Sequence, residues 1–493
     1  MEFVNVTIND KLLSVPKGIT ILAAAVSGGI RIPTLCTIKM LNPRANCGIC
    51  VVEVEGGRTY KPACVTRVSE GMVVRTDTPA LRKSRKTTLE LLLSRHAVDC
   101  HHCLRIGSSK CEDLDPKFCE MCFFCDCVRD GFCELQTLAR EYKVDALPYE
   151  MEPYKYEIDS STGSIVRNPN KCIKCRRCSD ICNSVQTVHA LNVINRGSEI
   201  MVTTEGQKRH ADSSCVQCGR CVQSCPTGAL FFKEHIDALL YNTHNYDITT
   251  IAQISSGVLE ELSTLFKFGS SELDIRIVAA GLRKIGVDYV LTDDFASAKA
   301  INAAASALAD KIKRDKKSPI IITDSYAAAK FMKHNFADFS ELLLNYASPQ
   351  QEFGKYAKTV FAAEKQLVTK NIRTISIVSD NENAAEAVEN GSVDFVVNAR
   401  ELYRIFLRTG VNPKRIHPSE LDSFGSIENS YVQFGKLFAP VTWEVGNNTE
   451  KLDLYIGNTN VKAAVAKNLG QVRELLTEVK NGISPYNVVR INA

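Results

Sequence analysis

Twenty cysteines dominate the chemistry open to this chain, and all of them lie in its first 225 residues. Four come early, the other sixteen lie between His96 and Cys225, and none follows. Thiolates bind iron–sulfur clusters or zinc, or form disulfides in oxidising compartments. The N-terminal MEFVNVTIND has neither the basic start nor the apolar core of a signal peptide. We therefore expect a cytoplasmic protein whose cysteines are metal or redox ligands.

The most specific pattern is a doubled run of cysteines in residues 151–235. Each run has the spacing C-x2-C-x2-C-x3-C, the pattern of ferredoxins that hold two 4Fe–4S clusters. In such proteins the fourth cysteine of each run binds the other cluster, which makes the two clusters neighbours. The expected ligands are Cys172, Cys175, Cys178 and Cys225 for one cluster, and Cys182, Cys215, Cys218 and Cys221 for the other.

The four early cysteines are spaced C-x10-C-x2-C-x13-C, and they are Cys36, Cys47, Cys50 and Cys64. Structural zinc sites usually contain two close pairs, whereas only one is present here, so the spacing favours a 2Fe–2S cluster over zinc. Gly48 lies inside the close pair, where it lets the backbone wrap closely around an inorganic core. Alternating apolar residues over 3–15 predict a hairpin, and a helix is expected over 20–27.

These four positions resemble the ferredoxin-like N-terminal domain found in complex I's large peripheral subunit and in iron-only hydrogenases. A helix is expected over 81–96, and SRHAVDCHHC and CELQTLAREY then resemble the His-plus-three-Cys 4Fe–4S motif of the same two families. A neutral imidazole in place of a thiolate should raise the reduction potential of such a cluster. The ligands implied by the resemblance are His96, Cys100, Cys103 and Cys133.

A cysteine-rich insertion, residues 104–132, departs from those families, where the last two ligands lie only a few residues apart. We expect it to hold a further 4Fe–4S cluster or a zinc ion on four of its five cysteines. The five are Cys111, Cys119, Cys122, Cys125 and Cys127. Another allocation stays open, because CLRIGSSKCE also resembles the families' closing turn. Cys111 would then complete the His96 site, and Cys133 would join Cys119, Cys122 and Cys125.

The second half of the chain changes character at about residue 236. Apolar runs alternate with helical stretches, which predicts an α/β domain with a mostly parallel sheet. The expected strands cover 248–254, 289–291, 319–322, 374–378 and 395–397. The expected helices include 297–312, 349–363, 400–409 and 461–480.

Three segments of this half resemble the catalytic domain of iron-only hydrogenases: NYASPQQEFGKYAK from Asn345, NAREL from Asn398, and VKAAVAKNLGQVRELLTEVKNG from Val461. The active-site cluster of that family needs four cysteines in this domain, and none is present. Ser325, Tyr326 and Asp380 stand near expected cysteine positions, and the chain ends at RINA, where the last cysteine loop should begin. Oxygen ligands do not replace thiolates on a cubane, so we expect a scaffold without the hydrogen-activating cluster.

Other ligands are disfavoured by the sequence. The formal charge of +4 gives no reason to expect nucleic acid, and no apolar run approaches the roughly 18 residues of a membrane span. Neither G-x-G-x-x-G after a strand nor G-x4-G-K-[ST] occurs, so we expect no flavin or nucleotide on this chain.

Together these features predict four domains of mixed α+β and α/β class. Residues 1–80 are expected to form a β-grasp 2Fe–2S domain, and 81–150 a 4Fe–4S domain with one histidine and three cysteine ligands, together with its insertion. Residues 151–235 are expected to form a two-cluster ferredoxin domain, and 236–493 a hydrogenase-like α/β domain. The expected cofactors are one 2Fe–2S cluster and three 4Fe–4S clusters, or four if the insertion binds one.

The resemblance implies an electron-transfer subunit of a soluble flavin-based electron-bifurcating NAD(P)H/ferredoxin oxidoreductase, a transhydrogenase of the Sporomusa type. Expected partners are an NADH-binding flavoprotein subunit, a small thioredoxin-like 2Fe–2S subunit, an NADPH-binding flavoprotein subunit, and ferredoxin. One alternative is the electron-transfer subunit of an NAD-dependent formate dehydrogenase complex, which differs only in its partners. Another is a non-enzymatic redox sensor, which would need fewer clusters. An active hydrogenase is disfavoured by the missing cysteines.

Overall fold

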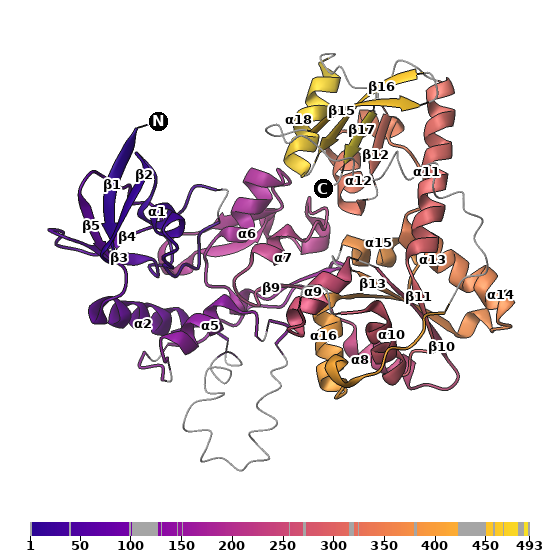
Figure 1. Cartoon of the computed structure of the whole chain (residues 1–493), viewed down its shortest axis with the longest axis horizontal. Coiled ribbons are helices and arrows are strands. Elements are labelled where there is room, and N and C mark those ends of the chain that lie inside the picture. Colours follow the sequence, from indigo (N-terminus) through magenta and orange to yellow (C-terminus); the bar gives the residue numbers. More distant parts are fainter. Residues whose placement is uncertain are drawn as a thin grey trace, which may run out of the picture.

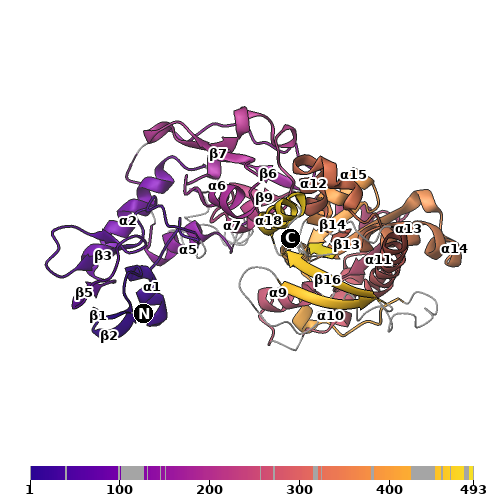
Figure 2. The ribbon, with the colours of Figure 1, turned by 90° about the horizontal axis from the view of Figure 1, so that it is seen from above.

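The computed structural model describes residues 2–38, 41–97, 100, 127–129, 131–144, 146–149, 151–255, 257–269, 273–314, 320–323, 325–378, 382–422, 450–456, 459–466, 468–481 and 488–491. The molecule is elongated, with one sheet at the N-terminal end and two further sheets at the other (Figure 1, Figure 2). A middle segment that contains α6 (Arg177–Asp180) and α7 (Arg220–Ser224) lies between them. Among the described helices, none has the length and apolar character to cross a membrane.

The N-terminal domain is a five-stranded mixed sheet with one helix packed on it. Its strands follow the order β2 (Lys11–Pro16), β1 (Phe3–Ile8), β5 (Met72–Arg75), β3 (Val51–Val54) and β4 (Lys61–Pro62). β1 is antiparallel to β2 and parallel to β5. Alternation along β1 turns Val4, Val6 and Ile8 towards α1 (Ile21–Ser27), where they are buried. The predicted hairpin and helix are confirmed, and a mixed sheet around one helix is what a β-grasp fold requires.

Two helices lead from this sheet towards the middle of the molecule. α2 (Pro79–Ser94) starts after Thr78, whose Oγ1 accepts the N–H of Leu81 at 3.2 Å. The helix therefore begins slightly before the predicted span of 81–96, and His96 lies just beyond its end. α5 (Glu134–Glu141) shares an apolar core with α2 through Leu89, Leu93 and Leu135.

The middle segment is built from short elements. β6 (Ile165–Arg167) pairs with β9 (Leu230–Phe232), and β7 (Leu191–Ile194) pairs with β8 (Met201–Thr204), both antiparallel. α6 continues into a π-helical turn, η2 (Ile181–Val185). Several of the buried side chains that these elements enclose are cysteines, which explains why so little regular structure is needed to fill this core.

The first lobe of the C-terminal half contains a four-stranded sheet that is entirely parallel. Its order is β11 (Tyr289–Thr292), β10 (Thr249–Ile254), β13 (Ile372–Val378) and β14 (Phe395–Asn398). One face is covered by α8 (Ile236–Thr243), α9 (Val258–Leu265), α10 (Ile275–Lys284) and α16 (Ala399–Arg408). The other is covered by α13 (Pro349–Tyr356), its extension through η7 (Ala357–Phe361) and α14 (Ala362–Glu364), and α15 (Glu382–Asn390).

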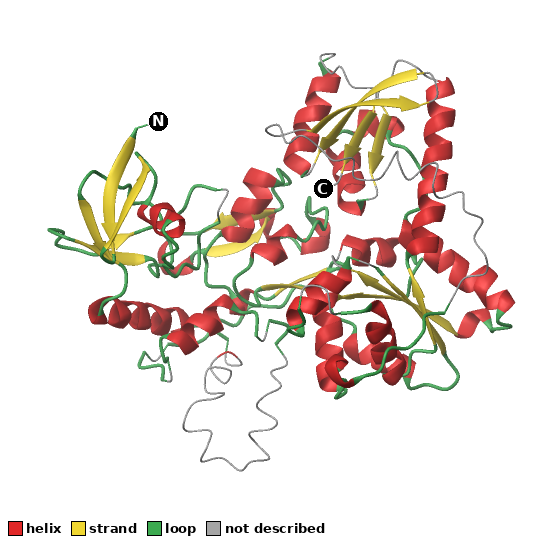
Figure 3. Cartoon of the chain, viewed as in Figure 1, coloured by secondary structure: helices red, strands yellow, loops and turns green. Residues whose placement is uncertain are grey.

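The second lobe is reached by α11 (Asp294–Arg314), which runs from one lobe to the other (Figure 1). Its sheet has the order β12 (Ile320–Thr323), β17 (Val488–Ile491), β16 (Thr459–Ala466) and β15 (Glu450–Ile456). The first three strands are parallel, and β15 is antiparallel to β16. α12 (Tyr326–Asn335) and α18 (Leu469–Lys480) pack together in the core of this lobe (Figure 3).

Two predictions about this half need correction. The predicted helix over 461–480 is wrong in its first part, because residues up to Ala466 form β16, which pairs with strands on both sides. The helix begins only at Leu469, where Asn468 caps it by accepting the N–H of Gln471 at 2.9 Å. The mostly parallel sheet is in fact two sheets, of which one carries an antiparallel hairpin. The other predicted strands and helices of this half are confirmed to within a few residues.

Candidate functional site

The four early cysteines converge in the N-terminal domain, and all four are buried. The Cys47 thiol donates to Cys36, which lowers the pKa of Cys36 to about 6 and raises that of Cys47. The Cys50 thiol likewise donates to Cys64, which lowers the pKa of Cys64. Two buried pairs of thiols, each joined by a hydrogen bond, form a donor set that suits a cluster.

Arg85 of α2 holds the loop that contains the close pair of cysteines. Its side chain is 1% exposed. Nε donates to the backbone oxygen of Ile49 at 3.1 Å, and Nη2 donates to that of Val51 at 2.7 Å. Gly48 has a φ of +67°, which glycine adopts without steric cost. The helix thus fixes a tight loop whose thiols point inward.

The His96 region is described only in part. His96 is 3% exposed and lies in the turn after α2, where its N–H donates to Leu93 O at 2.9 Å. Cys133 caps α5, and burial raises the pKa of its thiol to about 11. The negative charge of Cys127 contributes to that rise, so the two thiols are close. Cys100 is half-buried. The remaining predicted ligands lie outside the described residues: Cys103, Cys111, Cys119, Cys122 and Cys125.

The thiols of the doubled run are buried and interact electrostatically. Burial is the first cause of the raised pKa of Cys172, about 11, and of Cys215, about 12. Negative charge on Cys225 raises the pKa of the first three thiols of the first run, and negative charge on Cys182 does so for thiols of the second. These interactions agree with the predicted crossed grouping, in which Cys225 joins the first run and Cys182 the second. The grouping and the ligation both stay predictions.

The two runs repeat one loop geometry. Lys174 and Gln217 occupy matching positions with φ of 58° and 60°. Their N–H groups donate to the preceding cysteine: Lys174 N to Cys172 Sγ at 3.4 Å, and Gln217 N to Cys215 Sγ at 3.3 Å. Such bonds favour the thiolate and so prepare the sulfur for a metal. A Cβ on Gly219 would lie 2.7 Å from Cζ of Phe232, so a larger residue there would require the Phe232 ring to shift.

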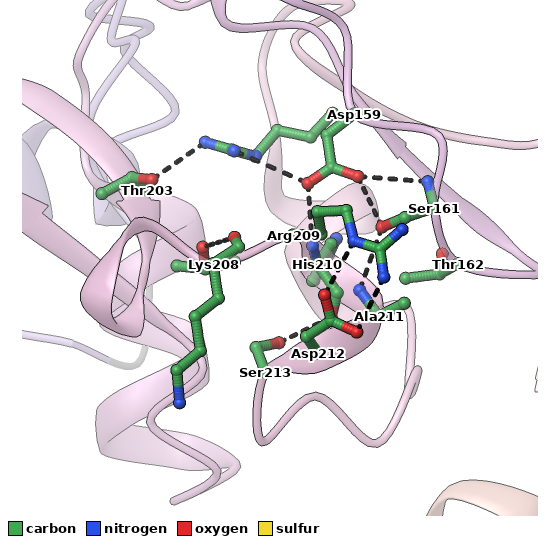
Figure 4. A network of polar contacts seen from close by, with 12 residues as sticks. Asp159, Ser161, Thr162, Thr203, Lys208, Arg209, His210, Ala211, Asp212 and Ser213 are labelled. Atoms are coloured by element: carbon green, nitrogen blue, oxygen red, sulfur yellow. Dashed lines mark hydrogen bonds and ion pairs between the residues drawn. The ribbon is translucent and has the colours of Figure 1, made fainter.

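A polar network joins the segments that precede the two runs (Figure 4). Asp159 Oδ1 accepts the hydroxyl of Ser161 at 2.6 Å, and its Oδ2 accepts the N–H of His210 at 2.8 Å. Arg167 pairs with Asp159 at 3.7 Å. Burial acts to raise the pKa of Asp159, but these hydrogen bonds and Arg167 outweigh it and lower the pKa.

His210 belongs to the same network and is 1% exposed (Figure 4). Burial lowers the pKa of its imidazole to about 4, so the ring is neutral at physiological pH. Arg167 Nη1 donates to Thr203 Oγ1 at 3.3 Å, which ties β6 to β8. The network therefore holds the segment that precedes the first run against the segment that precedes the second.

Three packed cores link the groups of cysteines in series along the molecule. The first contains Cys36 and Cys47 of the N-terminal domain together with Cys175 and the partly buried Cys133. The second contains cysteines of both runs. The third joins Cys182, Cys215 and Cys218 to apolar residues of α12 and α18 in the second lobe. Each group thus shares packed side chains with the next, as a relay of electrons over short steps requires.

α18 is anchored directly on the segment that follows Cys182. Arg473 donates from Nε to Thr187 Oγ1 at 3.0 Å and from Nη2 to Thr187 O at 2.9 Å. The N–H of Leu469 donates to Gln186 Oε1 at 3.2 Å. A Cβ on Gly470 would lie 2.6 Å from Val185 O, so glycine permits this close approach. The C-terminal lobe therefore supports the second run.

Polar side chains occupy the positions where the resemblance expected cysteines. Ser325 caps α12 by accepting the N–H of Ala328 at 3.2 Å. Burial raises the pKa of Tyr326, whose hydroxyl accepts Lys330 Nζ at 3.4 Å. Lys330 also pairs with Glu389 of α15 at 3.1 Å, which links the two lobes. Asp380 lies outside the described residues.

The polar residues of the NAREL segment, 398–402, have structural roles. Asn398 caps α16 by accepting the N–H of Glu401 at 2.9 Å. Glu401 is 1% exposed, and its Oε1 accepts the N–H of His235 at 2.6 Å. Burial raises the pKa of Glu401 to about 8. The segment therefore joins the first lobe to the end of the middle segment.

Sequence reasoning missed the cations that surround the thiols. Lys171 Nζ lies 3.7 Å from Cys127 Sγ, and the buried Arg129 donates from Nη2 to Cys225 O. Arg177 Nη1 contacts both carboxylate oxygens of Glu134 at 2.9 Å. The run KCIKCRRC carried a signal, because basic residues between cysteines offset the negative charge of bound thiolates.

The donor set has the chemistry that iron–sulfur clusters use. In the ranges described, no three His, Cys, Asp or Glu side chains are placed to hold one metal ion. The described groups are thiols, with His96 as the imidazole predicted among them, and several are served by backbone N–H donors. Soft ligands in buried loops with N–H donors are what such clusters use.

Comparison with protein families matches most of the chain. Residues 2–79 match the 2Fe-2S iron-sulfur cluster binding domain, and residues 171–229 match the 4Fe-4S dicluster domain. Residues 248–493 match the family described as iron only hydrogenase large subunit, C-terminal domain.

Three curated relatives cover different shares of the chain. The NADP-reducing hydrogenase subunit HndD of Solidesulfovibrio fructosivorans is 31% identical over 97% of this chain and 84% of its own length. Iron hydrogenase 1 of Clostridium pasteurianum is 24% identical over 99% of this chain and 82% of its own. An NADH-quinone oxidoreductase subunit of Rhizobium meliloti is 37% identical, but over 46% of this chain and 24% of its own.

Proposed function

Because this chain belongs to the family of iron-only hydrogenase large subunits, we propose that it is the electron-transfer iron–sulfur subunit of an NAD(P)-linked oxidoreductase complex. The observation that carries the proposal is the series of thiol groups, each packed against the next, from the N-terminal domain to the second lobe. A relative that spans nearly the whole chain is called an NADP-reducing hydrogenase subunit, which supports the link to a nicotinamide.

The proposed ligands follow the grouping of the thiols. A 2Fe–2S cluster takes the four early cysteines, and two 4Fe–4S clusters take the crossed groups, with Cys225 in the first and Cys182 in the second. A further 4Fe–4S cluster takes His96, Cys100, Cys103 and Cys133. When bound, these clusters accept and donate single electrons. The chain itself holds the thiolates in buried loops, donates N–H groups to sulfur and excludes water.

The C-terminal domain supports the relay in this proposal and does not activate hydrogen. Residues 226–493 contain no cysteine, and oxygen or amine side chains do not replace thiolates on a cubane. Ser325 is engaged in capping α12, and Tyr326 and Lys330 bond to each other and to the neighbouring lobe. The role of the domain is to cover the second 4Fe–4S cluster through α12 and α18.

Within this class, we favour a flavin-based electron-bifurcating transhydrogenase in the cytoplasm. Its partners would be an NADH-binding flavoprotein subunit, a small thioredoxin-like 2Fe–2S subunit, an NADPH-binding flavoprotein subunit and ferredoxin. A relative that shares 46% of this chain is called an NADH-quinone oxidoreductase subunit, which supports a partner that reacts with NADH.

The test is anaerobic reduction of the chain, followed by electron paramagnetic resonance. NADH should leave the isolated chain oxidised and should reduce its clusters once the flavoprotein subunit is added. The Cys50→Ser variant should lose this reduction but keep the reduction of its 4Fe–4S clusters by dithionite. Reduced methyl viologen should yield no hydrogen. Hydrogen evolution, or direct reduction of the isolated chain by NADH, would contradict the proposal.

A further inference from the structure

Arg129 is a buried cation that the relay described above leaves unexplained. Its side chain lies between the loop of Cys225 and the start of α5, and it is 7% exposed. Nη2 donates to the backbone oxygen of Cys225, and Nε has no hydrogen-bond partner. The N–H of Glu134 donates to Pro226 O at 2.9 Å, so the two loops are joined beside this side chain.

Within the described residues, no carboxylate neutralises Arg129. The negative charge of Glu134 favours the charged form of Arg129, but both oxygens of Glu134 already accept from Arg177 at 2.9 Å. The positive charge of Arg400, in contrast, disfavours the charged form of Arg129. Arg400 is 44% exposed and pairs with Glu261 at 3.3 Å, so solvent and a carboxylate stabilise its charge. Arg129 has neither.

A guanidinium keeps its proton under physiological conditions, and an unpaired buried charge costs several kcal/mol. A negative charge close to Arg129 would therefore stabilise it. The groups whose negative charge favours the cation most are the thiols of Cys225, whose backbone oxygen accepts from Arg129, and of Cys133. Both are proposed cluster ligands, and a cluster with its thiolates carries net negative charge that increases by one on reduction.

We propose that Arg129 is the shared counter-ion of the two clusters bound through Cys133 and Cys225, and that its charge raises the reduction potentials of both. This inference rests on the cluster ligation proposed above. A fixed cation stabilises the reduced, more negative form of each cluster. Because Arg129 lies between the two, it favours the electron on this pair over the neighbouring sites. It also ties the two loops at a fixed separation through its bond to Cys225.

The experiment compares three variants of the full chain, loaded with clusters under anaerobic conditions. Arg129→Gln removes the charge, and Arg129→Lys keeps it. Arg58→Gln removes a charge from an exposed loop of the N-terminal domain and serves as the matched control. Iron and acid-labile sulfide are measured first. Potentials are then measured by redox titration with electron paramagnetic resonance, in which the 2Fe–2S signal is an internal reference.

We expect Arg129→Gln to shift the 4Fe–4S signals of these two clusters to more negative potentials and to leave the 2Fe–2S signal unchanged. Arg129→Lys should recover most of the shift, and Arg58→Gln should match the wild type. Loss of a cluster in Arg129→Gln but not in Arg129→Lys would also support the need for a charge. Unchanged potentials in a loaded Arg129→Gln chain, or equal defects in both variants, would overturn the inference. A wild-type chain that binds no clusters would overturn the proposed function as well.

Discussion

Replacement of Glu401 by glutamine should change how the stability of the first lobe depends on pH. Burial raises the pKa of Glu401 from the ordinary 4.5 to about 8. The folded state therefore holds this proton more tightly than the unfolded state does. As pH rises from 4.5 towards 8, the folded state either keeps a proton that the unfolded chain releases, or buries a charge. Stability is consequently highest below pH 4.5 for this group and falls across that window.

The magnitude follows from the same two values. A difference of about 3.5 pH units at 1.36 kcal/mol each gives an upper bound of about 5 kcal/mol. The glutamine side chain of the variant would keep an acceptor for the N–H of His235 and carry no charge. Glu401→Gln should therefore match the wild type near pH 5 and exceed its stability increasingly up to about pH 8.

Hydrogen exchange of the α16 amides provides the assay, because it reports the local opening of this helix in a chain whose domains need not unfold together. Wild type and variant are compared at the same pH, so the intrinsic exchange rate cancels. Glu260→Gln, on the exposed face of α9, is the control and should have no such effect. An equal difference in protection at pH 5 and pH 8 would refute the assigned burial of charge.

The remaining predictions concern the support of the crossed cysteine groups. Gly470→Ala should force α18 away from Val185 O, which lies 2.6 Å from the added Cβ. The free energy of unfolding of the second lobe should fall by about 1–3 kcal/mol, which faster proteolysis of this lobe would show. Arg473→Ala should lower the same free energy of unfolding by about 2 kcal/mol or more, because it removes the two hydrogen bonds to Thr187. Lys480→Ala, at the exposed end of α18, is its control. Cys182→Ser should remove about four iron atoms and the cluster of the second run, whereas Cys225→Ser should remove that of the first. If both variants lost the same signal, the crossed grouping would be wrong.

Sequence patterns predicted the elements whose local signals agree with their packing. The alternation of Val4, Val6 and Ile8 is a property of one strand, and Ser325 is a cap by chemistry alone, so both were predictable. The spacing of the cysteines also indicated the repeated loops that close around Cys172 and Cys215, and the crossed grouping stays a prediction.

Tertiary contacts decided what the sequence could not show. Residues 461–466 read as the start of a helix, but pairing with strands on both sides makes them β16. The division of the C-terminal half into two sheets depends on which strands meet across α11. Arg129 and Glu401 differ from other charged residues only in their burial, which no local pattern reports.

The most direct test of the relay is the content of iron, zinc and acid-labile sulfide per chain in anaerobically purified protein. One 2Fe–2S and three 4Fe–4S clusters require about 14 iron atoms, and a fourth 4Fe–4S cluster in the insertion requires about 18. We predict about 18 iron without zinc if the insertion extends the relay, or about 14 iron with one zinc if it is a structural site. Iron well below 14 in fully loaded protein would contradict the central claim that this chain carries electrons through four or more clusters.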